Sequence, residues 1–281
     1  MYAADLLAGQ SILITGGGTG LGKAMALRMA SLGAKVGISG RRAAPLLDVV
    51  AEIEAAGGQA AAVQMDVRDP ASVKAGVDAL EATLGPLTGL VNNAAGNFLC
   101  ASEDLTPNAF NSVVQIVLYG TFHCTTELGR RWIARDSGGS VLNILTTYAW
   151  MGSGFVMPSA AAKAGVLAMT RSLAVEWATY RIRCNGIAPG PFPTEGAFSR
   201  LMAGGMEEAA LKRIPAGRFG EPTELADLAV YLMAPRAAYI TGEVVTIDGG
   251  EWLKGGQEFS GLTDLPRDEL KAALSAMRPG K

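Results

Sequence analysis

The sequence predicts an α/β fold in which a doubly wound parallel sheet of seven strands is flanked by helices. Short apolar runs rich in Val, Ile and Leu alternate with longer Ala-rich stretches of helical period, as in parallel sheets with crossover helices. A glycine-rich turn follows the first run and opens a helix. No internal repeat or Pro/Ser-rich linker divides the chain, so we expect one domain over residues 1–281.

The predicted strands are the apolar runs, because each is short and bounded by turn residues. They are SILIT at 11–15, KVGIS at 35–39, AAVQM at 61–65, GLVNN at 89–93, SVLNIL at 140–145, IRCNGIA at 182–188 and EVVTID at 243–248. Residues 189–215 interrupt the alternation and predict a long functional loop with a short helix. The C-terminal stretch LPRDELKAALSAM predicts a charged helix, which would cap the substrate side or pack on a partner subunit.

The composition excludes several classes of protein. With 49% hydrophobic residues the chain can bury a large core, whereas 18% charged residues and a net charge of -2 create no field that attracts nucleic acid or an anionic membrane. The N-terminal MYAADLLAGQ lacks a basic segment and a sustained apolar run, and no stretch predicts a membrane span. We therefore expect a cytoplasmic protein that binds small molecules.

Cysteine and histidine usage predicts no metal centre. Cys100, Cys124 and Cys184 are an odd, scattered set without Cys-x-x-Cys spacing, so disulfides are not predicted either, and we expect all three to be small buried side chains. His123 lies in a helical stretch without ligand partners and is interpreted as a packing or subunit-contact residue.

The glycine-rich turn TGGGTGLG predicts a phosphate site. Glycines permit positive φ and a close approach of the backbone to a pyrophosphate, and the helix N-terminus offers unpaired N–H groups. The alternative is that the glycines bind no phosphate and only allow a tight connection between the strand and the helix. The residues expected to contact the cofactor here are Gly16, Gly18, Thr19, Gly20 and Leu21.

The end of the second strand distinguishes NAD from NADP. A carboxylate there would bind the ribose 2′-OH, whereas a basic residue would pair with a 2′-phosphate. The sequence has Arg41 and Arg42 and no carboxylate, which predicts NADP(H) bound by Arg41, unless the arginines only solvate a helix start. Asp66 is expected to accept the adenine amino group or to cap the next helix, for which Asp69 before Pro70 is better placed.

Six motifs occur in order: TGGGTGLG, the Asp66-Val67 pair, NNAAG, the Lys163 segment, IAPGP and YITGEVVTIDGG. With them the chain resembles the short-chain dehydrogenase/reductase family over roughly residues 8–252. The resemblance implies one Rossmann-like domain, a C-terminal extension at 253–281 and a homo-oligomer, with a tetramer favoured. It also implies that the nicotinamide carboxamide is met by Pro189, Gly190, Pro191 and Phe192.

The active-site segment departs from the common pattern of that family. Ser159 stands where a tyrosine is expected, four residues before Lys163, Thr146 replaces a serine, and Val117 replaces a helix asparagine. These changes exclude the ordinary alcohol/ketone mechanism. The stretches NNAAGNF, LTPNAF, TTYAWMGSGFVMPSAAAKAG and PGPFPTEGAFSRL instead resemble the 2,4-dienoyl-CoA reductases, which implies that Tyr148 is the acid.

Reduction of a conjugated dienoyl thioester explains the displaced tyrosine. Hydride adds at the δ carbon and the charge runs to the thioester oxygen, so hydrogen-bond donors must lie farther from the nicotinamide. Tyr148 and Asn97 would form an oxyanion hole, unless they are a core tyrosine and a turn residue. Lys163 would bind the nicotinamide ribose, and Ser159 would assist Lys163 or a bound water, or cap its helix.

The predicted function is the NADPH-dependent reduction of 2,4-dienoyl-CoA to an enoyl-CoA, expected to be the 3-enoyl isomer, in β-oxidation of unsaturated fatty acids. Two alternatives stay open: a reductase of another substrate, such as a 3-oxoacyl thioester, and a non-catalytic NADP-binding protein. For Arg68 and Arg200, a plain surface position is the alternative to the substrate contact that the resemblance implies. The resemblance places the acyl-CoA against Arg68, Phe98, Thr106 and Arg200.

Overall fold

The computed structural model describes residues 2–194 and 206–277, in which seven parallel strands form one sheet of order β3-β2-β1-β4-β5-β6-β7. The predicted fold class is confirmed, and β3 begins two residues earlier than the sequence suggested. The order reverses between β1 and β4, where open α/β sheets bind ligands at the carboxyl ends of the strands. The strands are β1 (Ser11–Thr15), β2 (Lys35–Gly40), β3 (Gln59–Gln64), β4 (Gly89–Asn92), β5 (Gly139–Ile144), β6 (Ile182–Pro189) and β7 (Val244–Ile247).

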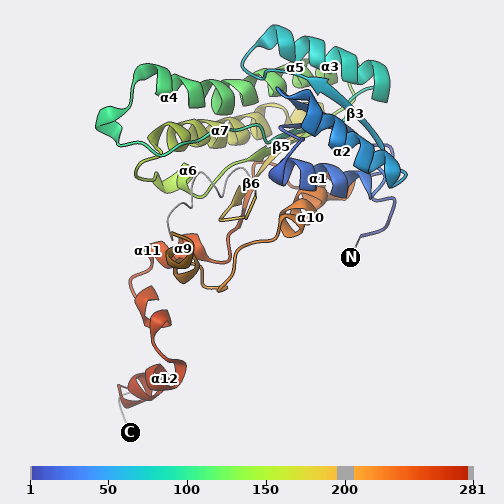
Figure 1. Cartoon of the computed structure of the whole chain (residues 1–281). Coiled ribbons are helices and arrows are strands. Elements are labelled where there is room, and N and C mark those ends of the chain that lie inside the picture. The colour runs from blue at the N-terminus through green and yellow to red at the C-terminus, as the bar shows by residue number, and fades with distance from the viewer. Residues whose placement is uncertain (1, 195–205, 278–281) are drawn as a thin grey trace.

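Helices cover both faces of the sheet (Figure 1). One face packs against α1 (Gly20–Ala30), α2 (Ala43–Ala55) and α10 (Pro222–Met233). The opposite face packs against α3 (Pro70–Leu84), α5 (Gly120–Arg135) and α7 (Met157–Glu176). Because side chains alternate along a strand, Ile12 and Ile14 enter the first core while Leu13 enters the second.

Shorter elements surround the carboxyl edge of the sheet. They are α4 (Pro107–Val114), a π-helical turn (Gln115–Tyr119), α6 (Tyr148–Met151), α9 (Met206–Arg213) and α11 (Glu251–Gly256). Val117, which stands where the family pattern has asparagine, lies buried in the π-helical turn. Asp69 caps α3 by accepting a hydrogen bond from the Ala71 amide at 2.9 Å, so the alternative that Asp66 is the cap is wrong.

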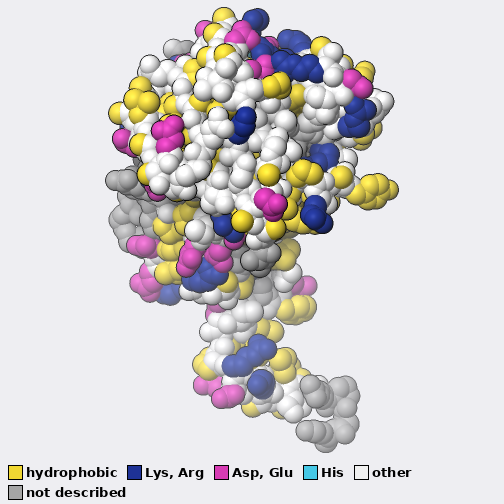
Figure 2. Space-filling view, turned by 90° about the vertical axis from the view of Figure 1, so that its right-hand side faces the viewer, with side chains coloured by type: hydrophobic (Ala, Val, Ile, Leu, Met, Phe, Trp, Pro, Cys, Tyr) yellow, Lys and Arg dark blue, Asp and Glu magenta, His cyan; other side chains and the backbone are white. Residues whose placement is uncertain are grey.

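Beyond α11 the chain leaves the body of the protein as an arm, residues 257–277, which ends in α12 (Arg267–Ala276) (Figures 1 and 2). Among the described residues, no hydrogen bond or ion pair joins α12 to the body. Several apolar side chains of the arm are exposed: Phe259, Leu265, Leu274 and Met277.

Two minor predictions of the sequence have mixed outcomes. Cys124 and Cys184 are buried and all three cysteines are free, but Cys100 is only half-buried, so the expectation for that residue is wrong. The His123 ring packs near the rings of Tyr119 and Phe122, and its Nδ1 lies within hydrogen-bond distance of the Val67 carbonyl oxygen at 3.0 Å. Within the described residues, no helix has both the length and the apolar character needed to cross a membrane.

Candidate active site

The glycine-rich turn joins the end of β1 to α1. Gly16 has a φ of 66°, which favours glycine, and a Cβ on Gly22 would lie 2.2 Å from the Gly16 carbonyl oxygen. Thr19, the N-cap residue of α1, makes no side-chain cap, and the first turn beginning at Gly20 and Leu21 carries no acidic residue. The N-terminal amides of α1 are therefore available to an anionic group, and the turn that includes Gly18 fits a pyrophosphate.

The end of β4 holds this turn in place. The Asn93 side-chain amide donates to the Thr15 and Gly16 carbonyl oxygens at 3.0 and 3.1 Å. The Thr15 hydroxyl in turn accepts from the amides of Asn93 and Ala94, each at 3.0 Å. Sequence reasoning assigned no role to Thr15 or Asn93, although the NNAAG motif was the signal that could have identified Asn93.

The two arginines after β2 are exposed, and neither has an ion-pair partner among the described residues. Arg42 is the N-cap residue of α2, whereas Arg41 lies just beyond the end of β2. Their exposed guanidinium groups suit a phosphate ester.

Asp66 and Arg68, which were predicted to bind different ligands, contact each other. The Arg68 guanidinium pairs with the Asp66 carboxylate at 2.5 Å, and this hydrogen bond lowers the pKa of Asp66. Arg68 is therefore engaged by a carboxylate in this structure. If Asp66 accepts an adenine amino group and Arg68 binds a phosphate, each residue must do so while it is paired with the other.

Three side chains predicted to be catalytic come together from three segments. The Tyr148 hydroxyl, at the start of α6, lies 3.0 Å from Ser159 Oγ on α7. The side-chain amide of Asn97, from the loop after β4, points to the same hydroxyl at 3.5 Å. Tyr148 is half-buried, so the alternative of a fully buried core tyrosine is wrong. The N-cap of α7 is Val156, so the alternative that Ser159 caps this helix is also wrong.

Lys163 lies one turn after Ser159 and is 6% exposed. Its ammonium donates a hydrogen bond to the Ile144 carbonyl oxygen at the end of β5. Burial lowers the pKa of the Lys163 ammonium to about 8. Nearby, the Thr146 hydroxyl is buried and lacks a hydrogen-bond partner among the described residues, although sequence reasoning gave it no role. The Lys163 ammonium and the unpartnered Thr146 hydroxyl are thus both buried polar groups.

A buried polar network holds β4 and β5 against the helices behind the site. Asn92 donates to Thr125 on α5 at 2.9 Å and to Asn143 on β5 at 2.8 Å, and Asn143 donates to Thr170 on α7 at 2.9 Å. These groups are almost completely buried, and their hydrogen bonds tie the ends of both strands to the helices, although the Asn92 Oδ1 has no partner among the described residues. Sequence reasoning did not identify this network, since its members lie far apart in the chain.

The residues after β6 form another wall. Gly190 packs against Asp248, and its amide donates to the Ile247 carbonyl oxygen at 3.0 Å. The Phe192 ring is buried against Gly220. A cavity of about 180 Å³ lies beside this wall, lined in part by Pro191 and Phe192. The predicted contacts of Pro189, Gly190, Pro191 and Phe192 with the nicotinamide carboxamide stay predictions.

The residues predicted to contact the acyl-CoA belong to different segments of the chain. Phe98 packs against the core formed by α4, α7 and the end of β5. Thr106 caps α4, accepting from the Ala109 amide at 3.2 Å. Arg200 lies outside the described residues.

The chain is similar to known proteins over most of its length. The family model described as enoyl-(acyl carrier protein) reductase matches residues 16–251. A Bacillus subtilis (strain 168) protein named probable 2,4-dienoyl-CoA reductase, (2E)-enoyl-CoA-producing, is 45% identical over 87% of this chain and 97% of its own length. A Caenorhabditis elegans protein named probable 2,4-dienoyl-CoA reductase 3, (3E)-enoyl-CoA-producing, is 44% identical over 87% of this chain and 81% of its own length.

Solved structures are similar over the same region. A short-chain dehydrogenase from Bacillus anthracis matches with a TM-score of 0.80 and 44% identity, over 89% of this chain and 98% of that chain. A putative 2-deoxy-D-gluconate 3-dehydrogenase from Agrobacterium tumefaciens, crystallised with bound NADP, matches with a TM-score of 0.80 and 34% identity, over 89% and 99% of the two chains.

Proposed function

Because the chain belongs to the short-chain dehydrogenase/reductase family, we propose that it reduces 2,4-dienoyl-CoA thioesters with NADPH, in β-oxidation of unsaturated fatty acids. The observation that carries the proposal is the contact between Tyr148 and Ser159. Ser159 occupies the position of the usual catalytic tyrosine, and its hydroxyl lies 3.0 Å from a phenol that enters from another helix. This contact supports the proposal that the Tyr148 phenol, instead of the side chain at position 159, is the acid.

NADPH would supply a hydride to the δ carbon of the substrate. The uncapped N-terminus of α1 would hold its pyrophosphate, and Arg41 would pair with its 2′-phosphate. Lys163 would donate to the hydroxyls of its nicotinamide ribose, and the backbone after β6 would meet its carboxamide. The NADP bound to the Agrobacterium tumefaciens structure supports this choice of cofactor.

Tyr148 and Asn97 would stabilise the negative charge that reaches the thioester oxygen. If Ser159 donates its proton to the Tyr148 oxygen, the phenolic proton is free to point at the substrate. The Asn97 amide lies 3.5 Å from the same phenol, so both donors can converge on one oxygen atom. Preorganised donors of this kind stabilise a dienolate without reorganisation during the reaction.

The acyl-CoA would lie against Phe98 and Thr106, with basic groups toward its phosphates. Arg68 can serve this role only by sharing its guanidinium with Asp66. Protonation of the dienolate at the α carbon gives a 3-enoyl product, which we favour, whereas protonation at the γ carbon gives a 2-enoyl product. The Bacillus subtilis relative is named for a (2E)-enoyl-CoA product and the Caenorhabditis elegans relative for a (3E)-enoyl-CoA product. Proton NMR of the product formed by this protein distinguishes the two isomers.

A spectrophotometric assay tests the proposed function. We expect NADPH oxidation with 2,4-hexadienoyl-CoA and little with acetoacetyl-CoA. Turnover of acetoacetyl-CoA alone would identify a 3-oxoacyl reductase. Turnover of neither would leave an NADP-binding protein without this activity. We also propose a homotetramer, for which light scattering should give four times the mass of one chain.

Replacement of the proposed acid is the sharpest variant. Tyr148→Phe removes the donor to the thioester oxygen, so we expect kcat to fall by about 10²- to 10³-fold with little change in NADPH affinity. Steady-state kinetics with 2,4-hexadienoyl-CoA and a fluorescence titration with NADPH measure the two quantities. Tyr180→Phe, at an exposed position just beyond the C-terminal end of α7, is the matched control and should keep full activity. An unchanged kcat in Tyr148→Phe would place the acid elsewhere.

A further inference from the structure

We propose that Trp252, on α11, is a positioning residue for Tyr148. The proposal rests on the proposed function, because it assigns Tyr148 the role of the acid. The two residues do not interact directly. They are connected through a stacked pair of indole rings, Trp150 and Trp252, whose centroids lie 5.5 Å apart with an interplanar angle of 26°.

The helix that carries Tyr148 is too short to hold its own geometry. It spans only Tyr148–Met151 and ends where the Gly152 amide donates to the Tyr148 carbonyl oxygen at 2.9 Å. A helix of one turn gains too few hydrogen bonds to offset the entropy of ordering it. Tertiary contacts must therefore fix its orientation, and with it the direction of the phenol.

Two residues of α6 supply those contacts. Ala149 is buried in the core formed by α4 and α7, and Trp150 packs against the edge of the same core. Part of the Trp150 ring is then covered by Trp252, which belongs to a segment about a hundred residues later in the chain. A stacked aromatic pair stabilises its geometry beyond the area that it buries, so this contact helps to fix the orientation of Trp150.

Trp252 is itself held at both ends of its helix. The Asp248 carboxylate, at the end of β7, accepts hydrogen bonds from the Gly250 and Trp252 amides, each at 2.8 Å. At the other end, Lys254 donates to the Lys212 carbonyl oxygen of α9 at 2.9 Å. Trp252 thus lies on a turn that is held by hydrogen bonds, so its indole can hold the stacked Trp150 ring in place.

Asp248 links this turn to the cofactor side of the site. Its side chain packs against Gly190, in the segment after β6 that is proposed to meet the nicotinamide. One continuous set of contacts therefore runs from that segment through Asp248, Trp252 and Trp150 to Tyr148. We infer that it sets the position of the phenol relative to the nicotinamide.

Kinetics of the full-length protein test the proposal. Trp252→Ala is expected to lower kcat for 2,4-hexadienoyl-CoA roughly tenfold to a hundredfold with KM changed less than about threefold, because a misplaced donor weakens transition-state binding. Trp252→Phe keeps an aromatic ring against Trp150 and should restore most of kcat. Leu253→Ala, at the neighbouring exposed position, is the matched control and should match the wild type.

Hydrogen exchange provides a measurement that does not depend on activity. Trp252→Ala should speed amide exchange in residues 148–152, while Trp252→Phe and Leu253→Ala should not. If the wild type reduces no dienoyl-CoA, the proposed function fails, yet the exchange result still tests the contact. Unchanged exchange in Trp252→Ala, or a change in KM with kcat preserved, would overturn the positioning role.

Discussion

At the scale of single residues, the contact proposed between Lys163 and the cofactor would make NADPH binding sensitive to pH. Its pKa is lowered by burial to about 8, so the ammonium is fully charged below that pH and loses its proton above it. A neutral amine does not attract the anionic cofactor electrostatically, and it has one hydrogen-bond donor fewer for the ribose hydroxyls. NADPH affinity is therefore expected to fall as pH rises through 8.

Fluorescence titrations with NADPH between about pH 7 and pH 9 measure this dependence. Lys163→Met should bind NADPH weakly and show no such slope. Lys74→Met, at an exposed lysine paired with Asp78, should behave as the wild type. If the slope persists in Lys163→Met, another group is responsible for it.

Arg41 is expected to set the preference between cofactors. Because its guanidinium has no ion-pair partner among the described residues, it is free to pair with a 2′-phosphate. Arg41→Ala should weaken NADPH binding by roughly tenfold to a hundredfold, as the loss of a charge-assisted hydrogen bond implies, and leave NADH binding unchanged. Arg42→Ala is the adjacent control. Equal losses for both cofactors would show that Arg41 does not contact the 2′-phosphate.

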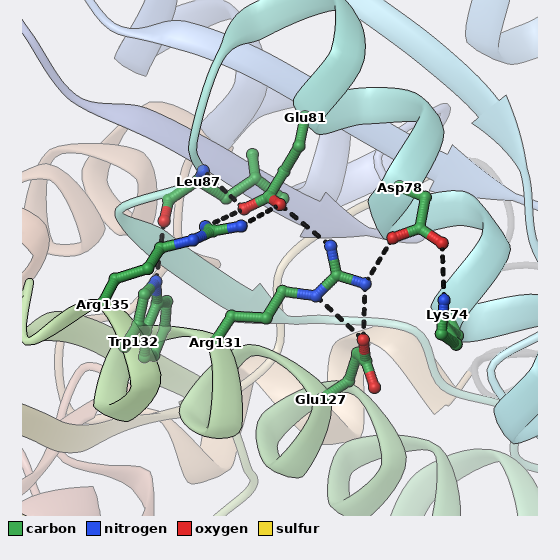
Figure 3. A network of polar contacts seen from close by, with 8 residues as sticks. All are labelled: Lys74, Asp78, Glu81, Leu87, Glu127, Arg131, Trp132 and Arg135. Atoms are coloured by element: carbon green, nitrogen blue, oxygen red, sulfur yellow. Dashed lines mark hydrogen bonds and ion pairs between the residues drawn. The ribbon is translucent and has the colours of Figure 1, made fainter.

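At the scale of elements, α3 and α5 are joined by a network of charged side chains away from the active site (Figure 3). Glu81 on α3 accepts from Arg131 at 2.9 Å and from Arg135 at 2.6 Å, and Arg131 also pairs with Asp78 and Glu127. Burial alone would raise the pKa of Glu81, but the hydrogen bonds from Arg135 and Arg131 lower it to about 2. This carboxylate therefore stabilises the packing of the two helices.

The sign of the pH dependence follows from that lowered pKa. The folded-state value of about 2 lies below the ordinary 4.5, so the stabilisation is complete above pH 4.5 and is lost as pH falls toward 2. At pH 7, Glu81→Gln should lower the free energy of unfolding by about 1–3 kcal/mol, because two arginines lose their charged acceptor. Urea unfolding at neutral and acidic pH measures both effects.

A matched control for this variant is Glu208→Gln. Glu208 pairs with Lys212 on the surface of α9, with both side chains exposed, so the midpoint of unfolding should not shift. The effect of Glu81→Gln should also vanish near pH 2, where the wild-type carboxylate is largely protonated. A difference that stays constant with pH would point to packing rather than charge.

At the scale of the whole molecule, α12 is expected to be independent of the body in a single chain, whereas the first part of the arm is tied to α11 through the Lys254–Asp264 ion pair. No described hydrogen bond or ion pair connects α12 to the body, so its removal should not weaken the cooperative core. Deletion of residues 266–281 should leave the thermal midpoint and NADPH affinity unchanged. A lower midpoint together with a smaller oligomer would instead show that the arm packs on a partner subunit.

Much of the molecule could be predicted from local pattern. The alternation of apolar runs and helical stretches predicted seven parallel strands because each parallel strand, covered on both faces, has to be apolar along its length. The bounds of β3 were less well predicted, since Gln59 and Ala60 carry no strong strand preference and join the strand through pairing with β2. Pairing between distant segments is not encoded in any short window.

The candidate site divides in the same way. The sequence by itself determined the glycine-rich turn, the basic end of β2 and the absence of a tyrosine before Lys163, because these depend on residue type at a fixed spacing. Only the tertiary structure decided that Ser159 contacts Tyr148, that Arg68 pairs with Asp66, and that the indole of Trp252 covers Trp150. The physical reason is that side-chain partners are selected by where separate elements end in space, which depends on the packing of the whole sheet and its helices.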